Sequence, residues 1–460
     1  MSELDTTEQA AAASPTPFAE ARSRRNATFI VFLVVFIDLL GLGIVLPLLP
    51  LYANRLLGPL YPVESHRILH GSVLGALMAS FSFMQFLFAP IYGRVSDRVG
   101  RRPILLLGLT GSVLFYALFA YASHIGFAEQ QYGLALVLIL LSRVGAGVAG
   151  ATISTAQAVI ADCTTPATRA RGMALIGAAF GIGFTFGPIL CYTSFFVPTK
   201  AAPGAAASLL SLLALVLAIV LLPETLRTGG AAGRRHWLRF GATREALRMP
   251  VVGALILTFF LATLAFGSLE STLALMNQVL LSAGHVVVPM DQLTDEQLEE
   301  IIRKSCLIFA YVGLVLMLIQ GMVYRRLVGR VGELRFLRAG VLLMLVGLGG
   351  VIATVLAVAR GAFSGPAAVI PVALVILAVL VTGFALMTPS VQSLISKKAD
   401  QSRQGEILGV NQSMSALARI LGPAFGGFLF FAEPSHVLPY VAGAALMAVV
   451  MVLTLRLRTE

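Results

Sequence analysis

The sequence predicts an all-α membrane protein with twelve transmembrane helices in two pseudo-symmetric halves of six helices each. Three observations lead to this prediction. Apolar runs of membrane-spanning length follow one another along the chain, turns rich in basic residues alternate with turns that have few, and short motifs of the first half recur in the second. The composition agrees, because only 12% of the 460 residues are charged and 58% are hydrophobic, whereas a soluble protein carries about 25% charged residues.

Twelve runs of residues are long and apolar enough to cross a bilayer, for which an α-helix needs about 20 mostly apolar residues. Helices are expected rather than strands, because every backbone polar group in lipid must be satisfied internally and the runs are too long for barrel strands. In chain order the runs are 28–53, 72–92, 103–122, 132–159, 173–195, 205–222, 251–280, 306–323, 336–358, 367–389, 408–431 and 437–455.

The polar segments between these runs indicate where the helices end. The two prolines of the segment Pro47–Pro50 bend or break the end of the first run, or serve only as loop-entry prolines. The charged stretch 93–103 predicts a short polar turn between the second and third runs. The acidic insertion 282–304 follows the seventh run, and there Thr294 and Gln297 have the spacing of a capping box that starts a short surface helix.

The positions of the 33 Lys and Arg residues predict the topology. With the helices above, 25 of them lie on the side of the N-terminus, 6 lie on the other side, and 2 (Arg143 and Arg419) lie within helices. Short loops that remain in the cytoplasm are enriched in basic residues. We therefore expect the crowded side, called the basic side below, to be cytoplasmic and to carry both termini. The other is called the opposite side. The expected location is the plasma membrane, which in a bacterium is the inner membrane.

The chain divides into four parts. Residues 1–26 are rich in Ala, Ser, Thr, Pro and Glu, which predicts a disordered cytoplasmic tail. Residues 27–222 form the N-terminal half, 223–250 a basic cytoplasmic linker, and 251–460 the C-terminal half. A short amphipathic helix is expected over 234–247 within the linker.

Motifs of the first half recur in the second half at a nearly constant spacing. The matched positions are Gly187-Pro188 with Gly422-Pro423 and Gln157 with Gln392, at a spacing of 235 residues, and Arg98-Val99-Gly100 with Arg330-Val331-Gly332, at a spacing of 232 residues. The second copy has Gly329 where the first has Asp97. A parallel repeat of two six-helix halves is typical of transporters that bind substrate near the membrane midplane, between the halves.

The stretch between the second and third runs resembles the loop 2–3 signature of the major facilitator superfamily, G-x-L-x-D-R-x-G-R-[KR]. It reads Gly93-Arg94-Val95-Ser96-Asp97-Arg98-Val99-Gly100-Arg101-Arg102, with Val95 in place of the usual Leu. The resemblance implies a gating role, in which Asp97 latches onto the start of the eleventh helix with Arg101 as its partner and holds the cytoplasmic side shut. The alternative is a cluster that only sets topology, which does not account for an acid at Asp97.

Three further stretches are similar to the drug:proton antiporter branch of that superfamily. Asp38 to Pro50 resembles the start of tetracycline exporters, Arg143 with Gly147 and Gly150 resembles the branch's helix 4 arginine motif, and Ala161 to Pro188 resembles its helix 5 antiporter motif. The antiporter motif normally ends in Gly-Gly, and Cys191-Tyr192 stands there instead. None of the six histidines lies in the middle of a predicted helix, whereas tetracycline exporters share a functional histidine in the second half.

Two acidic residues lie within predicted helices. Asp38 is about ten residues into the first run, and Glu270 follows it by 232 residues in the seventh run, so the repeat makes them equivalent. A charge near the bilayer centre costs roughly 2.5–3.5 kcal/mol on insertion scales. A buried carboxyl group can load and release a proton near neutral pH, and both residues are therefore candidates for proton coupling. The alternative is a structural hydrogen bond between helices.

Other polar residues within helices are candidates for the site. The resemblance gives Arg143 a role in proton coupling, through contact with the substrate or with a nearby carboxylate. Gln157, Gln392, Asn411 and Arg419 are candidates to line the substrate cavity. The alternative for the amides is hydrogen bonding between helices, and Arg419 has the alternatives of packing a helix junction or snorkelling to the interface.

Glycine and proline mark the fifth and eleventh helices. The residues concerned are Gly183, Gly187, Pro188, Gly422 and Pro423. Glycine allows two helices in a membrane to approach closely, and proline bends a helix. We expect these residues to form packing surfaces along which helices slide or bend during transport.

Together these features predict a proton-coupled exporter, an antiporter of small hydrophobic or cationic compounds that works by alternating access and catalyses no reaction. The open alternatives are a proton-coupled symporter or facilitator that takes up a sugar or organic acid, and a non-transporting membrane receptor with the same fold. The expected partners are a small-molecule substrate, protons and the lipid bilayer, without nucleic acid, and the protein is expected to be a monomer. No cofactor or metal is expected, since the three cysteines lack metal-site spacing.

Overall fold

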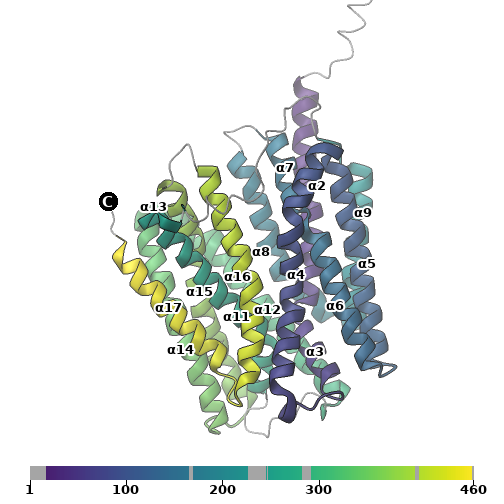
Figure 1. The fold of residues 1–460 in the computed structure, drawn as a ribbon, viewed down its shortest axis with the longest axis vertical. Helices are drawn as coiled ribbons and strands as arrows, with labels where there is room; N and C mark the ends of the chain where they lie inside the picture. The colour runs from purple at the N-terminus through teal and green to yellow at the C-terminus, as the bar shows by residue number, and fades with distance from the viewer. Residues whose placement is uncertain are drawn as a thin grey trace, which may run out of the picture.

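The computed structural model describes residues 17–164, 169–225, 245, 247–281, 292–398 and 404–457. These residues form helices joined by short turns, and no strand occurs among them. Figure 1 shows the helices side by side along the long axis of the molecule. Most of the predicted tail 1–26 and of the predicted linker 223–250 lies outside the described residues, as does most of the amphipathic helix expected over 234–247.

The first half consists of six spans, two of which are divided into more than one helical element. Its elements are α2 (Pro17–Val45), α3 (Leu49–Leu57), α4 (Val63–Val99), α5 (Arg101–Phe127), α6 (Tyr132–Ala149), η1 (Gly150–Thr152), α7 (Ile153–Cys163), α8 (Arg169–Ser194) and α9 (Ala202–Leu221). The first span contains α2 and α3, and the fourth contains α6, η1 and α7.

The second half repeats this order. Its elements are α11 (Pro250–Leu281), α12 (Asp295–Leu318), η3 (Ile319–Tyr324), α13 (Arg325–Val331), α14 (Glu333–Ala359), α15 (Pro366–Lys398), α16 (Gln404–Ala432) and α17 (Leu438–Arg456). In the described residues, 11 helical segments are long and apolar enough to span a membrane. With α8, a helix of 26 residues, they make the twelve spans. The predicted all-α fold with twelve transmembrane helices is confirmed.

Most helices are longer than the apolar runs that predict them. The second run covers 72–92, for example, whereas α4 covers Val63–Val99. An apolar run marks only the part of a helix that lipid surrounds, while backbone hydrogen bonding continues the helix into water. For the same reason α2 begins at Pro17, inside the segment 1–26 that the composition marks as a disordered tail.

The polar turn expected over 93–103 is reduced to a single residue. Helix α4 continues to Val99, Gly100 has φ 115°, and α5 begins at Arg101. The equivalent residue of the second half, Gly332, has φ 87° between α13 and α14. Glycine takes up positive φ without steric cost, so each half reverses direction on one glycine. A Cβ atom on Gly100 would lie 2.5 Å from Glu224 Oε2, so a side chain is also excluded by lack of space.

Several spans are interrupted at defined places. The first span breaks after Val45, and Pro50 stands in the first turn of α3, in agreement with a break at the two prolines. Pro90 lies inside α4, and the equivalent position in the second half, Met322, lies in the π-helical segment η3. Proline removes a backbone hydrogen bond and a π-turn replaces the usual bonding pattern, so the helical ladder is interrupted at equivalent points of both halves.

The capping box predicted in the acidic insertion is present, but it starts a different helix. The side chain of Thr294 accepts a hydrogen bond from the Gln297 backbone, and the Gln297 side chain accepts one from the Thr294 backbone. The capped helix is α12, the eighth span itself, rather than a separate surface helix. The expectation was wrong because polar residues 295–304 continue directly into the apolar run of the span. Residues 282–291 lie outside the described part.

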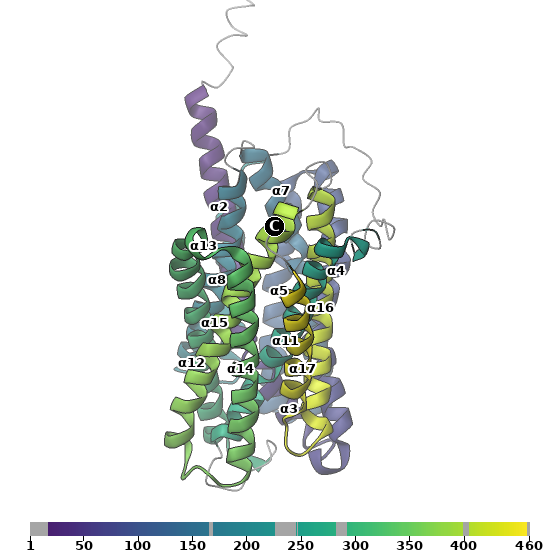
Figure 2. The ribbon, with the colours of Figure 1, turned by 90° about the vertical axis from the view of Figure 1, so that its left-hand side faces the viewer.

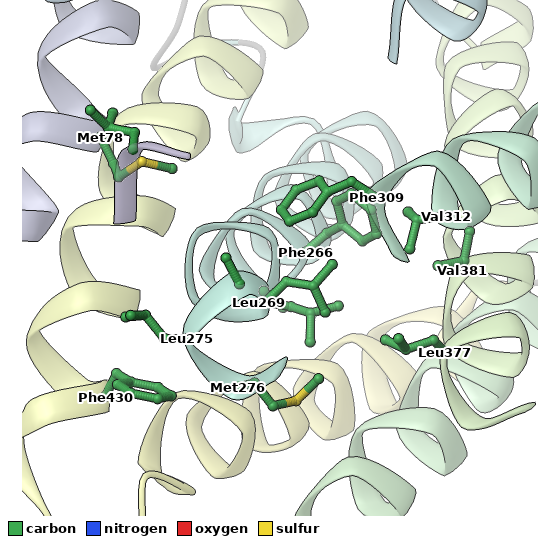
Figure 3. Close-up of a cluster of buried hydrophobic side chains, with 14 of the residues drawn as sticks. Met78, Phe266, Leu269, Leu275, Met276, Phe309, Val312, Leu377, Val381 and Phe430 are labelled. Atoms are coloured by element: carbon green, nitrogen blue, oxygen red, sulfur yellow. The ribbon is translucent and has the colours of Figure 1, made fainter. Parts of the chain in front are cut away.

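The helices of each half pack mainly on one another. In the first half, α2 packs against α8 and α9, and in the second, α11 packs against α16 and α17. The halves meet where α4 contacts α16 and where α8 contacts α12, and Figure 2 shows the bundle from the side of the second half. Figure 3 shows the apolar core around α11, in which Leu269 and Met276 lie between Phe430 on one side and Leu377 on the other.

Glycine permits the closest helix contacts within and between the halves. A Cβ atom on Gly187 of α8 would lie 2.6 Å from the Gly43 Cα atom of α2. Between the halves, a Cβ atom on Gly71 of α4 would lie 2.8 Å from the Gly427 carbonyl oxygen of α16. The contact at Gly71 lies toward the opposite side of the bundle, where α4 begins.

Replacing Gly187 by alanine should destabilise the protein, because the new methyl group overlaps Gly43 and α2 and α8 must move apart. Overpacking of this kind typically costs about 1–3 kcal/mol. A lower Tm of the purified variant in a thermal-shift measurement would show it. Gly181→Ala is the matched control on the same helix, because a Cβ atom there has nothing within 4 Å. Equal Tm values for the two variants would contradict the packing role of Gly187.

Candidate functional site

The two candidate carboxylates lie on the first long helix of each half. Asp38 belongs to α2 and Glu270 to α11; the side chain of Asp38 lies outside the described part. One turn beyond Asp38, Gly41 faces the ring of Tyr116 from α5, whose Cε2 atom would be 3.0 Å from a Cβ atom at Gly41. Tyr116 therefore packs on α2 next to the turn that carries Asp38.

Arg143 of α6 is a buried cation in the same half. Arg143 as a whole is only 4% exposed. Its guanidinium carbon lies 4.7 Å from the centroid of the Phe81 ring. The phenol of Tyr116 from α5 lies near Arg143. Among the described residues its Nε atom has no hydrogen-bond partner. A buried guanidinium needs an acid or water, and this arrangement leaves part of Arg143 available for one.

Glu270 and Arg419 lie close together in the second half. Each is the charged group that acts electrostatically on the other, yet they form no direct ion pair. Glu270 is half-buried on α11, and Arg419 is exposed on α16 although α16 is packed between α4 and α11. The repeat does not reveal this pairing, because the residue 235 positions before Arg419 is Phe184.

The three amide candidates have different surroundings. Gln157 is exposed on α7, and its repeat partner Gln392 is half-buried on α15. Asn411 of α16 is 1% exposed, and its Oδ1 atom has no hydrogen-bond partner among the described residues. A further amide that the sequence analysis did not select, Gln85 of α4, donates to the Gly150 carbonyl oxygen at 3.0 Å and so joins α4 to η1.

The gating motif forms a charge cluster within the first half. Asp97 pairs with Arg101 one turn later, and Arg101 also donates to Asp162 Oδ2 at 3.2 Å and to Ser96 Oγ at 2.7 Å. Gly93 lies against Ser154 of α7, and Arg98 is exposed. The cluster fixes the turn between α4 and α5 against α7. Asp162 is the partner that the motif alone did not identify.

Glu224 closes this cluster from the end of the sixth span. Its carboxylate accepts hydrogen bonds from the backbone N–H groups of Arg101 at 2.9 Å and Arg102 at 3.1 Å. A carboxylate at a helix N-terminus satisfies free N–H groups and is favoured by the helix dipole. The sequence assigned this kind of contact to Asp97 at the start of the eleventh helix. The latch between Asp97 and α16 stays a prediction, because residues 399–403 before α16 lie outside the described part.

On the opposite side, charged residues join the two halves. Glu299 of α12 pairs with Lys200, which precedes α9, at 3.0 Å and with Arg303 at 2.7 Å. Arg303 also donates to the Phe195 carbonyl oxygen at 2.9 Å. We call Lys200, Glu299 and Arg303 the clasp. The sequence did not predict it, since Lys200 and Glu299 are 99 residues apart; the only local signal was the spacing of four between Glu299 and Arg303.

Two cysteines meet just inside the clasp. Cys191 of α8 and Cys306 of α12 are both fully buried, and their Sγ atoms are 2.7 Å apart. They are free thiols. Because one belongs to each half, their exposure to a reagent reports whether the halves are in contact at this level.

Replacing Glu299 by glutamine should loosen the contact between the halves, because the ion pair with Lys200, which crosses between the halves, loses its anion. A loss of about 1 kcal/mol, the upper end for one partly exposed ion pair, raises the open population roughly fivefold. The labelling rate of Cys191 and Cys306 by N-ethylmaleimide, measured in a Cys163→Ser background, should rise by the same factor. Glu300→Gln is the control, because the side chain of Glu300 is 63% exposed and pairs only within α12. Unchanged labelling in Glu299→Gln would exclude the clasp as a determinant of closure.

Comparison with known proteins agrees with this architecture. The family model of the Major Facilitator Superfamily matches residues 31–423. The class E tetracycline resistance protein of Escherichia coli is 28% identical over 434 residues, which cover 93% of this chain and 94% of that protein. Human major facilitator superfamily domain-containing protein 10 is 28% identical over 461 residues, which cover 90% of each chain.

Two solved structures extend the comparison to the fold. The crystal structure of the human organic anion transporter MFSD10 (TETRAN) covers 96% of this chain and 100% of that chain, with a TM-score of 0.62 and 25% identity. That of a D-xylose-proton symporter covers 95% and 98%, with a TM-score of 0.72 and 16% identity, and so supports the fold alone. Because the family model spans most of the sequence, the chain belongs to the Major Facilitator Superfamily of membrane transporters.

Proposed function

We propose that the protein is a proton-coupled exporter of small amphiphilic compounds, either hydrophobic or cationic, that works by alternating access. The observation that carries the proposal is the pair of equivalent acids Asp38 and Glu270 on the first helix of each half. An acid inside a membrane bundle costs insertion energy. A protein that used this fold without transporting anything would have little reason to carry two such acids. The similarity to tetracycline resistance proteins over nearly the whole chain supports export.

The described conformation fits one state of an alternating-access cycle. The clasp and the glycine contact of Gly71 with Gly427 join the halves toward the opposite side. With the basic side in the cytoplasm of a plasma membrane, as the charge distribution predicts, this state is closed to the outside. Opening the clasp would give the other state, with the linker 223–250 connecting two rocking halves.

Protonation supplies the bias between these states. A proton on Asp38 or Glu270 removes a charge from the bundle interior, and each charge that crosses the membrane is worth about 2.3 kcal/mol per 100 mV. The positive charge of Arg419 acts on Glu270, and Arg143 is a buried cation in the half that carries Asp38. A cation close to an acid favours the charged form of that acid. Substrate that displaces a proton in one state, and is displaced by it in the other, is thereby moved against its gradient.

The direction of transport in everted membrane vesicles distinguishes the alternative functions. An exporter moves substrate into everted vesicles and releases protons from them, whereas an uptake symporter moves both in the same direction. A receptor with this fold would bind a compound without moving it. A thermal-shift screen of the purified protein identifies the compounds to use, since a ligand that binds only the folded state raises Tm.

Asp38→Asn should abolish coupled transport, because an amide cannot load a proton at this position. The assay uses everted vesicles that contain a pH-sensitive dye, to which the best compound of the screen is added. Vesicles with the natural protein should release protons, and vesicles with the variant should release few. Glu129→Gln, at an exposed turn after α5, removes a carboxylate elsewhere and should have no effect. Full proton release by Asp38→Asn would exclude Asp38 as the proton carrier.

Asp97→Asn tests the gate. The change removes the ion pair with Arg101 and any latch to α16, so the transport rate should fall several-fold while substrate affinity stays within about a factor of two. Transport into vesicles gives the rate, and binding to the purified protein gives the affinity. Glu64→Gln, an exposed acid at the start of α4 on the opposite side, is the control. Equal losses of rate and affinity would contradict a role in cycling.

A further inference from the structure

Arg419 faces the interior of the bundle and not the lipid. Gly426, two helical turns further along α16, faces α11, because a Cβ atom there would lie 2.7 Å from Ser271 Oγ. Residues seven positions apart lie on nearly the same face of a helix, so Arg419 also points toward α11. Arg419 is nevertheless exposed, so neighbouring helices leave part of its side chain uncovered.

Glu270 lies on α11 next to the place where α11 and α16 touch. Gly267, one turn earlier, lies 3.2 Å from the position of a Cβ atom on Gly422 of α16. Glu270 is half-buried, and the field of Arg419 reaches it without a direct ion pair. Two opposite charges thus lie near each other on neighbouring helices, each is partly uncovered, and neither is neutralised by contact with the other.

An aromatic surface adjoins Glu270 on α11. The ring of Phe266, one turn before Glu270, stacks on Phe384 of α15, with centroids 3.9 Å apart and planes at 5°. Phe266 is largely buried, so the half-buried ring of Phe384 supplies the accessible part of this aromatic pair. Flat aromatic surfaces favour ligands with planar ring systems, which they contact by stacking. Ligand sites typically combine such an apolar wall with a few polar groups that fix orientation.

We propose that Glu270 and Arg419 form a two-charge recognition site for a zwitterionic substrate with a planar aromatic body. Its acidic group would bind the Arg419 guanidinium, and its basic group would bind the Glu270 carboxylate. The inference rests on the proposed function only in placing the substrate inside the bundle. It replaces the class of hydrophobic or cationic compounds by zwitterionic ones, since a compound with one charge satisfies one of the two residues and leaves the other without a partner.

The site also accounts for exchange between substrate and proton. The basic group of the substrate and a proton bind the same carboxylate, so a proton on Glu270 weakens substrate binding. The acidic group is held by Arg419 in both states and carries the specificity. Loss of a hydrogen bond to a charged group typically lowers affinity about tenfold or more.

The test compares two dyes that differ at one group, a rhodamine with a free carboxylate and the methyl ester of the same rhodamine. The first is zwitterionic at neutral pH and the second is a cation. Fluorescence anisotropy with the full-length protein in lipid nanodiscs gives both affinities without a proton gradient, so the result does not depend on coupled transport. The natural protein should bind the free acid about tenfold more tightly than the ester.

Variants assign each charge to its residue. Arg419→Gln should remove the preference for the free acid, and Arg419→Lys should retain part of it. Glu270→Gln should lower the affinity for both dyes equally and keep the preference for the free acid. Arg360→Gln is the control, because Arg360 is exposed in the turn after α14 and its loss changes the net charge equally.

The proposal is overturned if the natural protein does not bind the free-acid dye, or binds it no more tightly than the methyl ester. Both outcomes are measured on the natural protein, without any variant. It is also overturned if a folded Arg419→Gln protein keeps the full preference. Failure of proton release in vesicles together with an intact dye preference would refute the proposed coupling and leave the recognition site standing.

Discussion

The cost of placing a polar group in lipid is the constraint on which the structure depends. It requires helices, because only a helix satisfies its own backbone within one span, and it accounts for the lack of charge over most of the twelve spans. It also makes the few exceptions informative. Three of these exceptions are Arg143 in the first half and Glu270 and Arg419 in the second. Arg143 is buried in protein, and Glu270 and Arg419 lie where α11 and α16 pack together. The retained charges therefore mark the functional part of the bundle.

Charge also organises the two water-facing sides, in different ways. On the basic side, Asp97, Arg101, Asp162 and Glu224 bind one another within a single half. On the opposite side, Glu299 binds Lys200 across the two halves. One cluster stiffens a half and the other joins the halves. The charged groups that join the halves can be solvated by water when the halves separate. This keeps the free-energy cost of breaking their ion pair low.

The twelve spans and the repeat follow from the sequence, because span length and apolar composition are set by the bilayer itself. Helix ends such as Val63 and Val99 of α4 do not, since a helix that leaves the lipid has no apolar signature. The contacts within the charge clusters were harder to predict. Glu224 and Arg101 are 123 residues apart, and nothing in either local pattern names the other. The repeat relates Asp38 to Glu270 but cannot supply Arg419, because the equivalent residue of the first half is Phe184.

The interruptions at Pro90 and in η3 occupy equivalent places but differ in kind. A proline kink is fixed to one residue, because only that residue lacks the N–H group. A π-turn holds an extra residue relative to the α-helical bonding pattern. Its conversion to regular α-helix would turn the helix beyond it by about 100°, and that helix is α13, which leads to Gly332. A proline kink allows the first half only to bend at this place, whereas a π-turn also offers the second half a rotation about the axis of its eighth span.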